Sequence, residues 1–184
     1  MSSDAMTNGP EAPTGTTGAV DLGDASRRLL EETFNTGNFD LVEQFVAGDA
    51  LNHDPALPAE LRDLRGVEAF KRIVAMYRTA FPDLRMTVDD VIASSDRVVL
   101  RWHSEGTHRG KLAGLAPTGV HGSVTGISID QWNNDKIVET WAEWDNFGLA
   151  RQLGAAPPEG SVGEKIGLGL QQLMARWMRR KNST

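Results

Sequence analysis

Four side chains of the kinds that transfer protons in enzymes are candidates for catalysis in this chain: His53, His108, Glu143 and Asp145. Burial raises the pKa of a carboxyl group and lowers that of histidine, so either group can approach the neutral range in which general acid–base catalysis works best. The chain contains no cysteine, which excludes thiolate nucleophiles, thiolate metal ligands and disulfides. These residue types therefore point to proton transfer by side chains.

Motifs for metals, nucleotides and nucleic acids are weak. His103 and His108 have opposite parity along one predicted strand, so they do not form a metal motif, and residues 110–114 lack the features of a phosphate loop. A formal net charge of −6 argues against a general nucleic-acid-binding protein. No apolar run approaches the roughly 20 residues of a membrane span, and the N-terminus does not resemble a signal peptide. We therefore expect no metal, cofactor, nucleic-acid partner or membrane span, and a cytoplasmic location.

The first part of the chain has the spacing of amphipathic helices. Residues 24–37 form the first predicted helix, with Asp24 as its N-cap, and residues 38–48 form a shorter second one. Residues 49–65 contain two prolines and are predicted as a loop. A third helix is predicted over residues 66–81, because apolar residues recur there every three to four positions.

Farther along the chain the apolar period changes from about 3.6 to 2. Four strands are predicted at residues 85–94, 98–106, 123–132 and 136–144, and residues 133–135 form the turn between the last two. Helices followed by antiparallel strands predict an α+β domain, with the N-terminal helices packed on one face of a curved, mainly antiparallel sheet.

The two ends of the chain differ from the predicted domain, which spans residues 23–154. Residues 1–22 are predicted to be a disordered leader, because they contain too little apolar surface to offset the entropy of ordering. Residues 155–163 are predicted as a linker and residues 164–184 as an amphipathic helix. This helix could pack on this chain or on a neighbouring one, attach to a membrane surface through the basic residues 176, 179, 180 and 181, or fray.

Several segments resemble the SnoaL-like polyketide cyclases, also called ester cyclases, which have the nuclear transport factor two-like fold. These segments are FNTGNFDLVEQFV, LNHDP, AFPDLRMTVDDVIASSDRVVLRW, GTHRGKLAGLAPTG and WDNFGLARQLG. The resemblance implies a cone-shaped α+β barrel around an apolar pocket, and homodimers or higher oligomers built through the outer face of the sheet. It also implies a metal- and cofactor-free aldol ring closure, which an acid/base group in the pocket catalyses.

Two positions depart from the family pattern. Relatives commonly carry an aspartate, the family's acid/base, at the position of Ala142, and an aspartate or histidine at that of Ser128. Two functions therefore remain open. The first is a cofactor-free enzyme that cyclises or isomerises an apolar polyketide or terpenoid by proton transfer. The second is a non-catalytic protein that binds a small molecule in the same pocket.

Each candidate residue also has a structural interpretation. His108 shares the parity of the apolar residues on its strand, so it faces the pocket or is a buried histidine that hydrogen-bonds a carbonyl. The resemblance places His53 and Asn52 at the pocket mouth, where they contact a ligand or cap the loop. Asp145 lies at a strand end, where it is an acid/base or caps the next turn, and Glu143 has the opposite parity to Ala142.

The remaining predicted ligand contacts are aromatic or small and polar. Aromatic residues at these spacings can line a flat pocket, although they can equally be ordinary core residues. The predicted substrate-binding residues are Asn52, Tyr77, Trp102, Ser128, Trp141 and Trp144.

Overall fold

The computed structural model describes residues 20–181, so most of the predicted leader lies outside the described residues. Helix α1 (Leu22–Thr36) begins two residues before the predicted N-cap, because Asp21, not Asp24, caps it by accepting a hydrogen bond from the Asp24 backbone. Gly37 ends α1 in the left-handed conformation that glycine adopts most readily. The second helix, α2 (Asp40–Phe45), is shorter than predicted.

The structure corrects the prediction of a loop over residues 49–65. Strand β1 (Val46–His53) begins where α2 ends and pairs in parallel with the last strand of the sheet, and the short helix α3 (Ala59–Arg62) follows it. The hydrogen-bonding partner of β1 lies about ninety residues away in the sequence, and its register is interrupted between Val46 and Leu51. A local apolar period therefore gave no sign of this strand.

The four antiparallel strands are confirmed as β2 (Arg85–Ala93), β3 (Arg97–Thr107), β4 (His121–Asn133) and β5 (Lys136–Trp144). They form one open sheet in the order β1-β5-β4-β3-β2. Asn134 and Asp135 have positive φ angles in the β4–β5 turn, as the sequence predicted for this hairpin.

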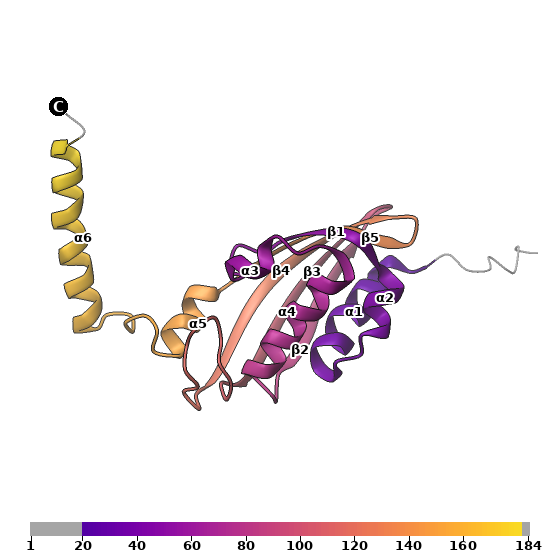
Figure 1. Ribbon diagram of the computed structural model, residues 1–184, viewed down its shortest axis with the longest axis horizontal. Coiled ribbons are helices and arrows are strands. Elements are labelled where there is room, and N and C mark those ends of the chain that lie inside the picture. Colours follow the sequence, from indigo (N-terminus) through magenta and orange to yellow (C-terminus); the bar gives the residue numbers. More distant parts are fainter. Residues whose placement is uncertain (1–19, 182–184) are drawn as a thin grey trace, which may run out of the picture.

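The N-terminal helices cover the concave face of the sheet (Figure 1). α1 packs on β2 and β3, and α4 (Gly66–Ala80) packs on β1. The core between the two layers consists of aliphatic and aromatic side chains from both, and its most buried members include Val42, Val74, Val98 and Leu100. The α+β class and its helix-on-sheet arrangement are therefore as predicted.

The C-terminal part of the described chain leaves the sheet through α5 (Asn146–Gln152) and continues into α6 (Val162–Lys181). In Figure 1, α6 stands apart from the sheet and the other helices. Arg151 of α5 forms a salt bridge with Glu164 in the first turn of α6. Most of the large apolar side chains of α6 are more than half exposed, including Ile166, Leu173 and Trp177.

Candidate active site

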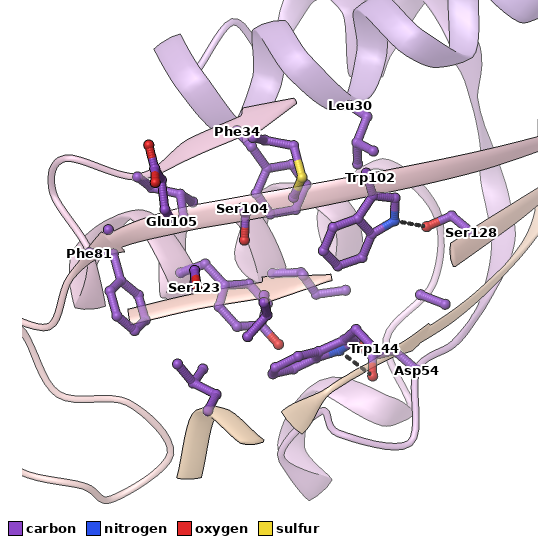
Figure 2. A pocket seen from close by; sticks show the side chains of 18 of the residues that line it. Leu30, Phe34, Asp54, Phe81, Trp102, Ser104, Glu105, Ser123, Ser128 and Trp144 are labelled. Carbon is purple, nitrogen blue, oxygen red and sulfur yellow. Dashed lines mark hydrogen bonds between the residues drawn. The ribbon is translucent and has the colours of Figure 1, made fainter. Parts of the chain in front are cut away.

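A cavity of about 120 Å³ lies between the helices and the concave face of the sheet. Its walls are mainly apolar and come from both layers (Figure 2). The lining residues include Leu30, Phe34, Phe70, Ile73, Tyr77, Phe81, Leu84, Met86, Trp102, Val124, Trp144 and Leu149. Such a cavity suits a small molecule whose surface is mostly apolar.

Trp102 on β3 forms one wall of this cavity. Its indole Nε1–H donates a hydrogen bond to Ser128 Oγ across 2.9 Å, which fixes the orientation of the ring (Figure 2). The opposite residue on β4 is Gly126, and a Cβ atom there would lie 2.4 Å from Trp102 Cζ2. The ring can therefore lie flat on β4 only because position 126 carries no side chain.

Two carboxyl-bearing residues line this cavity, Asp54 and Glu105, and Asp54 is the more buried of the two. Asp54 lies directly after β1, and its oxygens accept hydrogen bonds from the backbone of Ala56 at 2.9 Å and from Trp144 Nε1 at 3.4 Å (Figure 2). Burial raises the pKa of Asp54, and the negative charge of Glu143 acts in the same direction. The two hydrogen bonds and the charge of Arg62 lower this pKa without cancelling the effect of burial. A carboxyl group with a raised pKa is a stronger base than an exposed one, which suits it to proton transfer.

Tyr77 on α4 lies close to Asp54 and also lines the cavity. Burial raises the pKa of its phenol group, and the charge of Asp54 raises it further. The hydroxyl group therefore stays protonated at physiological pH and is available as a hydrogen-bond donor. The Tyr77 and Trp144 rings meet edge to face, with centroids 6.1 Å apart.

Five of the six predicted ligand contacts line the cavity: Asn52, Tyr77, Trp102, Ser128 and Trp144. The sixth, Trp141, lies on the outer face of β5, where its ring stacks on that of His53 at 5.3 Å. Asn52 Oδ1 is buried in the cavity wall and has no hydrogen-bond partner in the described chain.

The four predicted acid/base residues do not line the cavity. His53 faces outward and hydrogen-bonds Glu139 at 2.7 Å, and Glu143 is exposed on the same face. Asp145 caps α5 by accepting a hydrogen bond from the Gly148 backbone at 2.8 Å, the structural role that the sequence left open.

His108 is fully buried, in agreement with its strand parity, but it lies behind the cavity wall. Its ring packs on that of Phe81 with centroids 5.3 Å apart, so Phe81 faces the cavity and His108 lies outside its lining. His108 Nδ1 lies 3.2 Å from the Thr118 hydroxyl, not near a carbonyl, and Nε2 has no partner in the described chain.

Asp54 is the residue that the sequence analysis missed. It directly follows His53, in a segment predicted to be a loop. Had residues 46–53 been recognised as a strand, the parity of Asn52 and Asp54 would have placed both on the face opposite His53. The two-residue spacing of Asn52 and Asp54 was therefore the sequence feature that could have indicated this site.

Within residues 20–181, no group of three or more histidine, aspartate or glutamate side chains could hold a metal ion. In the same part of the chain, no helix has the length and apolar character needed to cross a membrane. The fold and the cavity therefore define an α+β protein with a mostly apolar cavity between its helices and its sheet, lined by two carboxyl-bearing residues, Asp54 and Glu105.

Known proteins share both the sequence pattern and this architecture. The family of SnoaL-like polyketide cyclases matches residues 25–153. Aklanonic acid methyl ester cyclase AcmA from Streptomyces galilaeus is 31% identical over 137 residues, which cover 73% of this chain and 92% of that protein. The chain belongs to the SnoaL-like polyketide cyclase family.

Solved structures agree with this assignment. TsrD from Streptomyces laurentii superposes with a TM-score of 0.63 at 25% identity, covering 74% of this chain and 99% of TsrD. IdmH from Streptomyces antibioticus gives a TM-score of 0.60 at 30% identity, covering 71% of this chain and 96% of IdmH. The predicted family and fold are therefore confirmed, and they support a role in polyketide cyclisation.

Proposed function

We propose that this protein is a cofactor-free enzyme of natural-product biosynthesis that closes or isomerises a carbon skeleton by proton transfer, with Asp54 as its acid/base. The observation that carries this proposal is a carboxyl group of raised pKa in the wall of an apolar cavity. His53, His108, Glu143 and Asp145 lie outside that cavity, so Asp54 takes the role first considered for them.

The proposed reaction begins when the Asp54 carboxylate removes a proton from a carbon between two carbonyl groups. The resulting enolate carbon attacks a second carbonyl carbon of the same molecule, which forms one C–C bond and leaves an alkoxide. The alkoxide takes the proton back from Asp54, so the product is an isomer of the substrate and the carboxylate is regenerated. No oxidant or reductant is required.

Tyr77 is suited to stabilise the enolate. Its protonated hydroxyl can donate a hydrogen bond to the oxygen on which negative charge develops, and the apolar surroundings strengthen that interaction. The aromatic walls formed by Trp102 and Trp144 would hold a flat, folded chain so that the reacting carbons meet.

A second candidate function is small-molecule binding without catalysis. The observation that favours it is Ala142, which lines the cavity where relatives commonly carry the catalytic aspartate. The two functions differ in one respect that can be measured, because only the enzyme converts its ligand.

The test uses aklanonic acid methyl ester, the compound in the name of the related cyclase. We expect the protein to convert it to a product of the same mass but different retention time, which chromatography and mass spectrometry would detect. Asp54→Asn should lower turnover by roughly 10² to 10⁴ with little change in KM. Glu139→Gln on the outer face is the matched control and should leave turnover unchanged.

Saturable binding by the unmodified protein without product formation would instead support the binding function. Full turnover by a folded Asp54→Asn variant would exclude Asp54 as the acid/base.

A further inference from the structure

Three polar side chains form a row across the inner face of the sheet, away from Asp54. Thr140 on β5 is paired with Asp130 on β4 and with Asn52 on β1, so the three residues are adjacent across three strands. Asn52 and Thr140 line the cavity, whereas Asp130 is buried behind them. The mechanism proposed above uses none of these three residues.

Hydrogen bonds around Asp130 fix the direction of the Thr140 hydroxyl group. Thr140 Oγ1 lies 2.9 Å from Asp130 Oδ1, and Ser26 of α1 also hydrogen-bonds the Asp130 carboxyl group. Burial raises the pKa of Asp130 to about 6 despite these two bonds. At pH 7.5 the carboxyl group is therefore ionised and has no proton to donate, so Thr140 must be the donor. The lone pairs of its oxygen remain free for a group in the cavity.

Asn52 supplies a second acceptor at the same place. Its Oδ1 is buried without a hydrogen-bond partner, which is costly unless a bound group satisfies it. A second hollow beside Asn52 and Thr140 measures only about 10 Å³, which leaves no room for an organic group there. An organic group that satisfies Asn52 Oδ1 therefore comes from the main cavity and is a donor, and a single hydroxyl proton can be shared between Asn52 Oδ1 and the adjacent Thr140 oxygen.

We propose that Asn52 and Thr140 form a subsite that binds a hydroxyl group of the ligand, whose single proton is donated to Asn52 Oδ1 and shared with Thr140 Oγ1, which Asp130 positions to accept from it. Asn52 and Asp54 are two residues apart at the end of β1, so the backbone of the subsite lies roughly 7 Å from that of Asp54. The inference rests on the proposed function in taking this cavity as the substrate site. It adds that the substrate is a mostly apolar molecule with a phenolic or alcoholic hydroxyl at about that distance from its reacting carbon.

The test compares two probes of similar size, 2-naphthol and 2-methylnaphthalene, by calorimetric titration of the full chain at pH 7.5. The measured quantity is the ratio of the Kd of 2-methylnaphthalene to that of 2-naphthol, which cancels general changes in cavity affinity. Loss of one hydrogen bond should lower this ratio roughly 3- to 10-fold in Thr140→Val and in Asn52→Leu.

Two variants serve as controls. Thr140→Ser keeps the hydroxyl group and should keep the ratio of the unmodified protein. Thr125→Val makes the same substitution at an exposed position on the outer face of β4 and should also leave the ratio unchanged. Asn52→Leu keeps the test decisive if Thr140→Val does not fold, because Asn52 Oδ1 has no hydrogen bond to lose.

An unchanged ratio in the folded cavity variants, or no saturable binding of 2-naphthol by the unmodified protein, would overturn the subsite. Its failure can be told apart from failure of the proposed function, because this experiment measures binding alone. Asp54→Asn should retain the ratio whether or not it retains turnover.

Discussion

The two faces of the sheet carry similar residue types in different environments. On the inner face, Asp54 and Asn52 line a mainly apolar cavity. On the outer face, His53 of β1 and Glu139 of β5 form a partly exposed hydrogen-bonded pair. His53 lies between Asn52 and Asp54 in the chain. Alternation along β1 is sufficient to separate the two groups. A residue type that can transfer protons therefore indicates a site only once its face is known.

Burial is the physical difference between these faces. It raises the pKa of Asp54 and that of Asp130, because removing a carboxylate from water disfavours its charged form. The outer-face ion pairs, such as Arg101 with Asp89, remain partly solvated and contribute little to stability. Four predictions test this comparison.

The largest expected difference is between the effects on kcat/KM of removing the Asp54 carboxyl group and of removing the Glu143 carboxyl group. Because Asp54 must be ionised to act as a base, kcat/KM should rise with pH up to its raised pKa and then level off. Glu143→Gln removes a negative charge that raises the Asp54 pKa, so the profile should move to lower pH while the plateau stays within about threefold. A fall of the plateau comparable to that of Asp54→Asn would show that Glu143 itself is catalytic.

Asp130 should make the free energy of unfolding depend on pH. Its pKa of about 6 in the folded chain lies above its ordinary value of 3.8, so the unfolded chain releases this proton at lower pH. The contribution of Asp130 is therefore full below about pH 4 and is lost as the pH rises to about 6. Asn at this position cannot ionise, so between pH 4 and pH 7 the free energy of unfolding of Asp130→Asn should rise by about 2 kcal/mol relative to that of the unmodified protein. Urea unfolding at several pH values measures this, and a constant difference would contradict it.

Close packing on the inner face should make Gly126 intolerant of a side chain. A Cβ atom at this position would overlap the Trp102 ring, so Gly126→Ala should cost about 1–3 kcal/mol of stability and weaken ligand binding. Gly48→Ala is the matched control, since nothing lies within 4 Å of a Cβ atom there. Equal melting temperatures for the two variants would show that the Trp102 ring can move to accommodate the added methyl group at little cost in stability.

Substitutions on the outer face should instead change the oligomeric state. An apolar row crosses the sheet in register through Ile92, Val99, Ile129 and Trp141, and Ile92 is 64% exposed. We expect a homodimer or larger homo-oligomer at tens of micromolar by light scattering, because such a row favours burial against another copy. Ile129→Lys should shift the mass to that of a monomer without lowering the melting temperature by more than a few degrees. A monomeric unmodified protein would show that this row is not a subunit interface.

Local patterns in the sequence were sufficient for most of the fold. The apolar periods of residues 66–81 and 98–106 predicted α4 and β3, and the Asn-Asn-Asp turn predicted the β4–β5 hairpin. Each of these features depends on neighbours within a few positions. The resemblance to a known family likewise rests on segments that can be read directly. Aromatic spacing pointed to the cavity residues Tyr77, Trp102 and Trp144, and also to Trp141, which the structure places on the outer face.

The tertiary structure decided which ionisable group faces the cavity. β1 exists because it pairs with β5, a partner far away in the sequence, and only that pairing turns Asp54 inward and His53 outward. The raised pKa of Asp54 likewise comes from burial by α4 and β5 side chains, which no local pattern encodes. The sequence by itself determined the residue types and the local elements. Long-range pairing and desolvation determined which of those residues could do chemistry, because both depend on residues that meet only in the folded chain.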